Sequence, residues 1–122
     1  RVASRVMAKI KKNSAIPKAL GVRGITLYPY IFLRDEGDDR LINHELIHIE
    51  QQRELWVVLF YILYVAHWLR AFSKLGDFKM AYYEIPFEKE AYANDDNLEY
   101  LKTRPKNAWK SWVKTPASQT PP

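Results

Sequence analysis

The stretch that decides the fold runs from Asn43 to Gln52 and reads NHELIHIEQQ. His44 and His48 are four residues apart, a spacing that puts both imidazoles on one face of an α-helix. Two imidazoles so placed can reach one metal ion. Glu45 lies about 100° around the helix, where a carboxylate can accept a proton from water without being a ligand. We therefore predict a zinc site with His44 and His48 as ligands and Glu45 as general base.

The helical pattern continues beyond this motif. It starts at Leu41, and no glycine or proline follows before Gly76, so one long or kinked helix and two successive helices fit equally well. Leu55 to Leu69 (LWVVLFYILYVAHWL) has no charged side chain apart from the titratable His67. This run has 15 residues and would span about 22 Å as a helix, whereas a bilayer requires ~20 residues. We expect a buried central helix, with contact at a membrane interface as the alternative.

The residues before the motif predict a small β element and a helix cap. Gly24 to Arg34 (GITLYPYIFLR) is rich in β-branched and aromatic residues, which predicts a strand or a hairpin arm. Pro29 confines this strand to a sheet edge or interrupts it with a bulge. In the acidic loop 35–39 (DEGDD), Asp38 or Asp39 is expected to cap the following helix.

The residues after the apolar run predict further helix. Pro86 is expected to begin a helix that continues from Phe87 to Lys102, because proline suits the first helical turn. Residues 108–113 (AWKSWV) predict a short amphipathic element. The expected fold class is α+β and mostly α-helical, with a short edge strand or hairpin before the His-bearing helix, a long apolar helix and a Glu-bearing helix.

Composition limits the class of protein. With 122 residues, 48% hydrophobic and 27% charged, the chain can form one domain, assigned to residues 1–114, and residues 115–122 (TPASQTPP) predict a disordered tail. The absence of cysteine excludes disulfides and thiolate ligands. The net charge of +5 comes without a nucleic-acid-binding motif, so no nucleic-acid partner is expected. No secretion signal opens the sequence, which favours a cytoplasmic protein, with membrane association as the alternative.

A catalytic zinc usually has three protein ligands and an open position, so one more ligand is needed. His67 is a candidate, although a single histidine in an apolar run is more often a packing residue. The glutamates of Tyr83 to Asp96 (YEIPFEKEAYANDD) are better candidates, because they lie on the next predicted helix.

These motifs resemble the gluzincin group of zinc peptidases, in which HExxH is followed by a second helix that donates a glutamate, and the small relatives called minigluzincins. Residues 24–34, 43–52 and 86–94 also look like a family of short, uncharacterised bacterial HExxH proteins. The resemblance covers most of the chain and names no substrate. It implies Zn²⁺ as cofactor, a peptide or protein as substrate and a glutamate as third ligand.

Which glutamate is implied depends on the alignment. The ExxA pattern places the ligand at Glu88, followed by Ala91, whereas a looser ExxxD pattern places it at Glu90, with Asn94 in the supporting role. We favour Glu88, because the small side chain of Ala91 leaves room for the helix that bears the histidines.

The sequence departs from the family at Tyr92, where the supporting aspartate would fall. Such a carboxylate orients a ligating imidazole, so either activity is weak or another residue, such as Glu84 or Asp95, takes its place. Tyr92, like Tyr82 and Tyr83, is instead a candidate donor to the oxyanion that develops during hydrolysis, and we select Tyr92 for this catalytic role.

Two functions follow. The first is a zinc-dependent metallopeptidase whose strand Ile25–Leu33 holds an extended peptide by strand addition, with Gln52 beside the site and not a ligand. The second is a catalytically degenerate peptidase fold that binds a protein partner or a membrane surface through its aromatic helix. The apolar run, the basic ends and the missing aspartate favour this second function.

Overall fold

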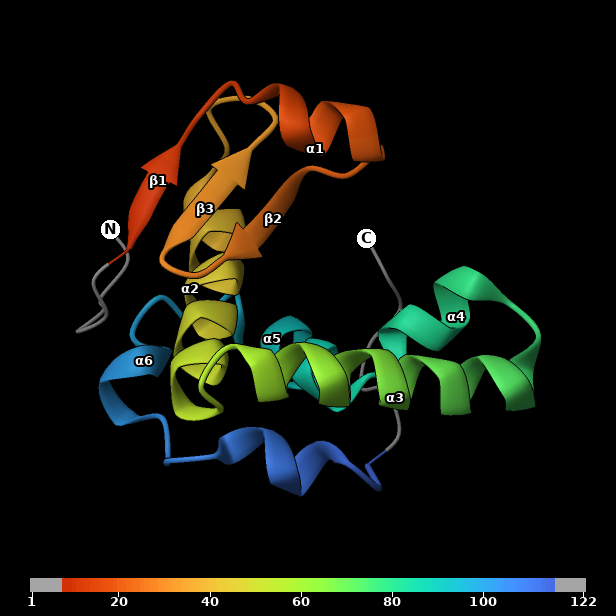
Figure 1. Cartoon of the computed structure of the whole chain (residues 1–122). Coiled ribbons are helices and arrows are strands. Elements are labelled where there is room, and N and C mark those ends of the chain that lie inside the picture. The colour runs from red at the N-terminus through yellow and green to blue at the C-terminus, as the bar shows by residue number, and fades with distance from the viewer. Residues whose placement is uncertain (1–7, 116–122) are drawn as a thin grey trace.

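The computed structural model describes residues 8–115 (Figure 1). Its elements are β1 (Lys9–Lys11), α1 (Ala15–Leu20), β2 (Gly24–Leu27), β3 (Tyr30–Leu33), α2 (Asp39–Glu54), α3 (Val58–Leu75), α4 (Phe78–Tyr83), α5 (Pro86–Asn94), α6 (Tyr100–Thr103) and the 3-10 helix η1 (Ala108–Trp112). The architecture is α+β and mostly helical, which confirms the expected class. The tail expected at 115–122 lies outside the described residues, apart from Thr115.

The small sheet has the order β1-β3-β2, with β1 parallel and β2 antiparallel to β3. The predicted hairpin is present, and Pro29 lies in the turn between its strands, where a missing amide proton costs no ladder hydrogen bond. Pro29 therefore interrupts the segment, as one of the two alternatives predicted, but with a turn and not a bulge; β2 lies at the edge and β3 is the central strand. The strand β1 was not expected, since three residues carry too little alternation to detect.

The motif helix α2 begins as predicted. The Asp38 carboxylate accepts a hydrogen bond from the Leu41 amide at 2.8 Å and caps the helix. The choice between one helix and two is settled as two, because α2 and α3 meet at 113°. Trp56 and Val57 form the corner with φ of 58° each, a conformation that a β-branched residue adopts only where packing compensates its cost.

The helix α3 lies across the end of α2 (Figure 1). Within α3 only Phe60 is buried, so the expectation of a buried central helix is wrong. Within residues 8–115, several of its apolar side chains are exposed: Val58, Leu59, Ile62, Val65, Leu69 and Leu75. Among residues 8–115, no single helix is long and apolar enough to cross a membrane.

The Glu-bearing helix is shorter than expected. It starts at Pro86, as predicted, but ends at Asn94, and a separate turn, α6, follows. The break occurs because the chain turns at Asp95, whose carboxylate bonds to side chains of α2. The short helix α4, capped by Asp77, was not predicted.

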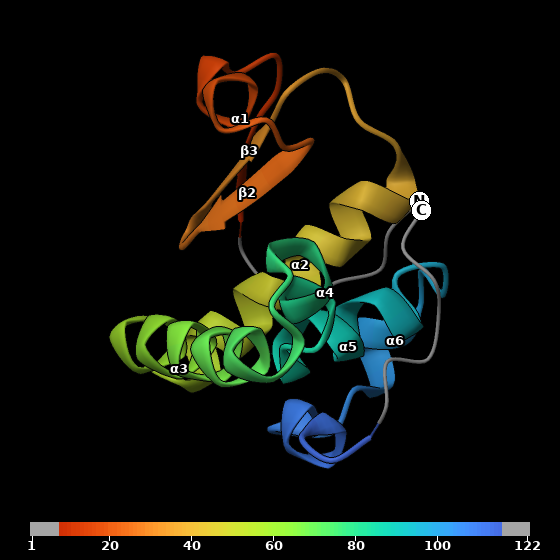
Figure 2. The ribbon, with the colours of Figure 1, turned by 90° about the vertical axis from the view of Figure 1, so that its right-hand side faces the viewer.

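Two apolar clusters hold these layers together. One joins the sheet, α2, α5 and α6 through Ile31, Leu33, Leu46, Ile47, Ile49, Ala91 and Leu101. The other joins α3, α5 and η1 through Leu55, Phe60, Ile85, Phe87 and Trp109. Figure 2, turned by 90°, shows α2 running beneath the sheet toward α3. Because α2 is covered on several sides, most of the residues between 43 and 52 are buried.

A buried ion pair fixes the segment after α5. The Arg104 guanidinium donates to Glu90 of α5 and to Glu54 of α2, at 2.5 Å and 2.9 Å. All three side chains are at most 5% exposed. Removing the cation would leave two carboxylates without compensation, which is far more costly than losing a surface pair.

We predict that Arg104→Ala lowers the free energy of unfolding of the metal-free protein by about 3–5 kcal/mol, as expected for one partner lost from a buried pair. Lys102→Ala is the control, because its ion pair with Glu99 is exposed and worth at most about 1 kcal/mol. Urea denaturation followed by circular dichroism measures both. Equal losses in the two variants would contradict the structural role of Arg104.

Candidate metal centre

Three side chains from two helices converge at the centre of the molecule. The Nε2 atoms of His44 and His48, on α2, each lie 3.1 Å from Oε1 of Glu88, on α5. All three residues are at most 5% exposed. Their ligand atoms lie within 4.8 Å of one another, an arrangement that can hold a metal ion. The structure therefore brings the predicted ligands together, with Glu88 in the third position.

The donor set fits zinc. Two imidazoles and a carboxylate are a known combination for catalytic zinc, with bonds of about 2.0–2.2 Å. Ligands at such distances in a tetrahedron are separated by about 3.3–3.6 Å, slightly more than the 3.1 Å separations between Glu88 Oε1 and both Nε2 atoms. A metal could thus enter with small side-chain movements.

His44 is oriented by an aspartate. Its Nδ1 lies 3.0 Å from Oδ2 of Asp95, whose Oδ1 accepts a hydrogen bond from Arg40 Nε at 2.7 Å. An imidazole that donates its Nδ1 proton presents the Nε2 lone pair to a metal. Asp95, one of the two residues predicted as a supporting carboxylate, therefore lies where it can orient His44. The other, Glu84, pairs instead with Lys89, its Oε1 lying 4.0 Å from Lys89 Nζ.

His48 is oriented by Gln51. The Gln51 amide nitrogen donates to the Phe87 carbonyl at 3.1 Å and to Glu90 at 2.9 Å, and both of these groups are acceptors. The amide oxygen must therefore face His48 Nδ1, at 2.7 Å, and accept its proton. The Nε2 lone pair of His48 is then free to bind a metal.

The second oxygen of Glu88 is held by a tyrosine from α3. Tyr64 donates its hydroxyl hydrogen to Glu88 Oε2 at 2.7 Å. With one oxygen held, the carboxylate would bind a metal through Oε1 alone. Burial, together with the charge of Glu88, raises the pKa of Tyr64 well above its usual value, so the hydroxyl remains a donor.

In the metal-free state protons take the place of the metal. Burial lowers the pKa of His44, but hydrogen bonds to Asp95 and Glu88 outweigh burial and raise the pKa to about 10. Burial would raise the pKa of Glu88, but the charge of His48 and hydrogen bonds from both imidazoles hold it well below its usual range. The raised pKa of His44 makes it an imidazolium beside two carboxylates in the metal-free state, so a metal that bound its Nε2 would displace a proton.

The predicted general base lies beside this cluster. Glu45 is 6% exposed, and its Oε1 accepts a hydrogen bond from Thr26 Oγ1 at 2.7 Å. Thr26 belongs to the edge strand β2, so the sheet positions the carboxylate. Glu45 does not belong to the group of three converging ligands. Its position about 100° around the helix from His44 predicts this.

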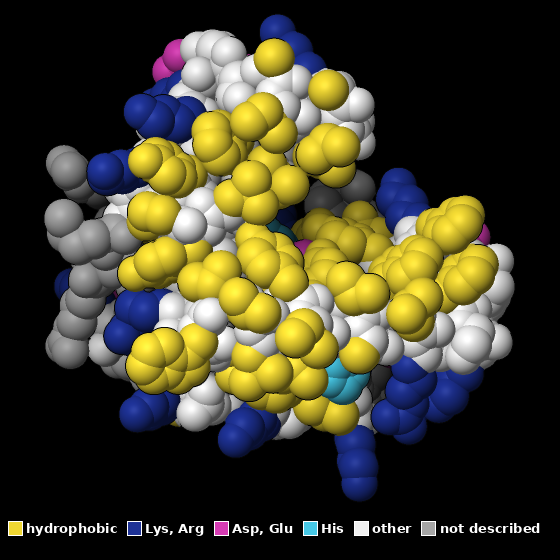
Figure 3. All heavy atoms as spheres, viewed as in Figure 1, with side chains coloured by type: hydrophobic (Ala, Val, Ile, Leu, Met, Phe, Trp, Pro, Cys, Tyr) yellow, Lys and Arg dark blue, Asp and Glu magenta, His cyan; other side chains and the backbone are white. Residues whose placement is uncertain are grey.

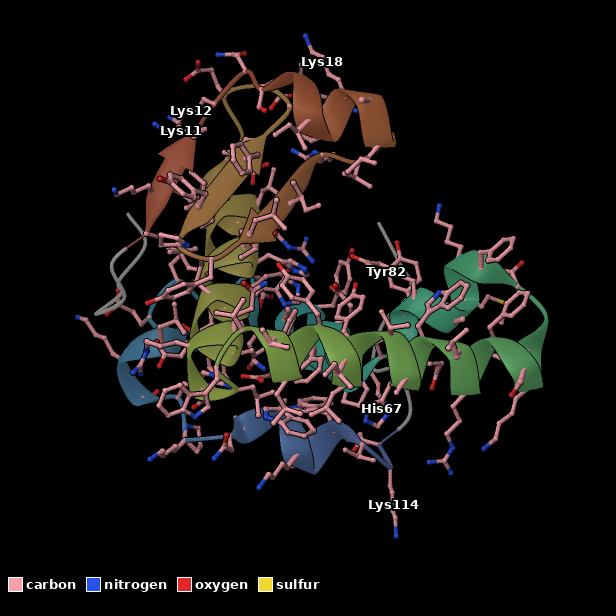
Figure 4. The ribbon with its side chains drawn as sticks, in the orientation of Figure 1. Lys11, Lys12, Lys18, His67, Tyr82 and Lys114 are labelled. Atoms are coloured by element: carbon pink, nitrogen blue, oxygen red, sulfur yellow. The ribbon has the colours of Figure 1, made fainter. Side chains whose placement is uncertain are left out.

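The site opens into a cleft of about 1050 Å³ between β2, α2, α3, α4 and α5. Figure 3 shows it as a hollow surrounded by hydrophobic side chains. Tyr82, Tyr83 and Tyr92 line the cleft; the Tyr82 and Tyr92 hydroxyls are 2.9 Å apart, and the Tyr92 ring packs edge-on against His44. In Figure 4, Tyr82 lies on the cleft side of α3 and His67 on the opposite side.

The remaining candidates lie elsewhere. His67 is not part of the cluster; burial and the charge of Arg70 lower its pKa. Glu90, the alternative ligand, is paired with Arg104 and supports Gln51. The hydrogen bonds of the Gln52 amide go to the hairpin and not to a histidine: its nitrogen donates to the Thr26 carbonyl and its oxygen accepts from the Tyr28 amide.

Several supporting residues were not expected from the sequence. Gln51 could have been found, because its position three residues after His48 puts both side chains on one helical face. Thr26, Arg40 and Tyr64 left no such signal, since they reach the site only through the tertiary fold.

Comparison with protein-family models, curated proteins and solved structures found no match. The chemistry of the site therefore rests on its own geometry.

We predict that the purified, untagged protein binds about one zinc ion per chain through three ligands. His48→Ala should weaken zinc binding by more than about 100-fold, because changes in supporting residues alone cost about 10–100-fold. His67→Ala, which lies outside the cluster, is the control and should bind as the unaltered protein does. Elemental analysis and titration against a competing chelator measure both. Normal binding by His48→Ala would refute the assignment.

The Asp95 carboxylate, which contacts Nδ1 of His44, should also affect zinc affinity. Asp95→Asn is expected to weaken zinc binding by about 10–100-fold, because it removes the negative charge that makes the imidazole a better ligand. Asp96→Asn changes the exposed neighbouring residue and should have little effect. The same chelator titration compares them, and equal affinities would show that Asp95 does not support the metal.

Proposed function

We propose that the protein is a zinc-dependent hydrolase that cleaves peptide bonds in the manner of gluzincins. The observation that carries this proposal is the convergence of His44, His48 and Glu88, with Glu45 beside them and a cleft in front. A purely structural zinc site normally has four protein ligands, whereas three ligands leave a position for substrate or water.

The division of roles follows from position. Zinc bound to these ligands supplies a Lewis acid that polarises a carbonyl and makes water more acidic. Glu45 accepts a proton from the attacking water and can pass it to the leaving amine. Thr26 holds one carboxylate oxygen, which leaves the other for water. Asp95 and Gln51 keep the two imidazoles in the tautomer that binds metal.

A tyrosine hydroxyl is the proposed donor to the developing oxyanion. Tyr92 lies against His44 and lines the cleft. Burial raises the pKa values of Tyr92 and Tyr82, which keeps both hydroxyls protonated and able to donate.

The edge strand favours a peptide as substrate. Among residues 8–115, β2 has a strand neighbour on one side only, and its residues line the cleft. The backbone at Gly24 passes beside the base, since a Cβ there would lie in van der Waals contact with Glu45 Cδ, at 3.6 Å. An extended peptide that added to this edge would pass the metal ligands. Gln52 already occupies the Thr26 carbonyl and the Tyr28 amide, so the peptide would pair toward Gly24.

We predict that Glu45→Gln keeps zinc but lowers hydrolysis by about 100-fold or more, the usual contribution of a general base. The amide oxygen can still accept the Thr26 hydrogen bond, so the fold and the metal site are retained. Zinc content is measured by elemental analysis, and turnover with a quenched-fluorescence peptide library.

Glu50→Gln is the matched control. Glu50 lies on the same helix but pairs with Arg53, away from the cleft. It should leave turnover unchanged. Full turnover by zinc-loaded Glu45→Gln would show that this mechanism is wrong, and a zinc-loaded protein that cleaves no library peptide would refute the peptidase proposal.

A further inference from the structure

An exposed aliphatic stripe runs along α3. Val58, Ile62, Val65 and Leu69 are 68%, 59%, 52% and 53% exposed, and their spacing of four, three and four residues aligns them on one side of the helix. Trp56, at the corner with α2, is 85% exposed. Continuous apolar surface of this kind marks an interaction site in a folded protein.

The charged side chains of α3 itself, Arg70 and Lys74, are all positive. No aspartate or glutamate occurs between Leu55 and Gly76. Exposed cations lie at the end of α3 and on its neighbours: Arg70, Lys74, Lys79, Lys110 and Lys114. Within the described part of the chain, none of these five makes an ion pair. Figure 3 shows Lys and Arg side chains around the border of the hydrophobic surface, and few acidic ones.

We propose that the α3 face, defined by Trp56, Val58, Ile62, Val65 and Leu69, docks on the surface of a bilayer that contains anionic lipid. Aliphatic side chains and an exposed tryptophan would enter the interface, while Arg70 and Lys74 would contact lipid phosphates.

Charge complementarity selects this occupant over a second copy of the chain. A symmetric dimer through α3 would bring the unpaired cations of two copies toward one apolar contact, with no acidic residue of α3 to balance them. An anionic surface balances them directly.

The geometry indicates docking along the surface, not insertion across it. α2 and α3 together are long and apolar enough to span a bilayer, but they meet at 113°. α2 also carries the buried polar groups of the metal centre, which require the protein around them. Of these two helices, α3 is therefore the one that can lie in lipid, parallel to the membrane plane. The cleft opens on the same view of the molecule (Figure 3), so docking would bring its mouth near the lipid.

The test is co-sedimentation of the full chain with vesicles of phosphatidylcholine, with and without phosphatidylglycerol. We expect salt-sensitive binding to the anionic vesicles only. Ile62→Ser/Leu69→Ser and Arg70→Glu/Lys74→Glu should each weaken binding by about tenfold or more, because each removes apolar burial or phosphate contacts. The altered side chains are exposed, so thermal melts should be unchanged.

Two matched controls test location. Ile10→Ser/Ile16→Ser changes two exposed aliphatic residues on β1 and α1. Lys11→Glu/Lys18→Glu makes the same charge change at the far end of the molecule (Figure 4). Both should bind within about twofold of the unaltered protein, since one exposed charge far from the surface contributes little beyond a Debye length.

Three results would overturn the proposal. The first is no binding to anionic vesicles, and the second is equal loss in the controls and the α3 variants. The third is a dimer in sedimentation velocity that Ile62→Ser/Leu69→Ser converts to monomer, which would assign the face to a second copy. None of these results depends on peptide hydrolysis, so this proposal and the proposed function fail separately.

Discussion

The structure depends on one carboxylate oxygen shared by two imidazoles. Glu88 Oε1 lies 3.1 Å from Nε2 of both His44 and His48, so α2 and α5 must cross where all three side chains meet. Burying these groups is costly unless each charge is compensated. In the metal-free state protons provide that compensation, and a divalent cation would provide it more strongly. The same three side chains therefore determine where the two helices cross and supply the ligands for a metal ion.

Two chains of hydrogen bonds extend from this point into the fold. One passes from His44 through Asp95 to Arg40, and so fastens the end of α5 to the start of α2. The other passes from His48 through Gln51 and Glu90 to Arg104, and so fastens the segment after α6. Supporting residues of the site are therefore also connectors of the fold. Their loss should affect stability and metal affinity together, whereas Glu45, which no such chain includes, can change its chemistry with little structural consequence.

The sequence could predict what short-range geometry determines. The spacing of His44 and His48, the Asp38 cap and the start of α5 at Pro86 all depend on residues within a turn or two of each other. The sequence could not predict the corner between α2 and α3, because no glycine or proline marks it. If α2 continued straight into α3, Tyr64 would lie too far from α5 to bond to Glu88. The early end of α5 could not be predicted for a related reason. It depends on the contact of Asp95 with His44, which lies 51 residues earlier in the chain.

The mistaken expectation for α3 has a physical explanation. A helix that is apolar on most sides is typical of a protein interior, yet among residues 8–115 only Phe60 of α3 is buried. One side of α3 supplies Phe60 and Tyr64 to the metal centre, and the opposite side carries aliphatic residues that the described chain leaves exposed. The contacts of the first side explain why α3 is rich in aromatic residues. They do not explain the aliphatic residues of the opposite side, because exposed apolar side chains do not stabilise the fold. A surface with anionic lipid would account for both the uncovered stripe and the unpaired cations beside it, and it would do so without moving α2 or the metal ligands.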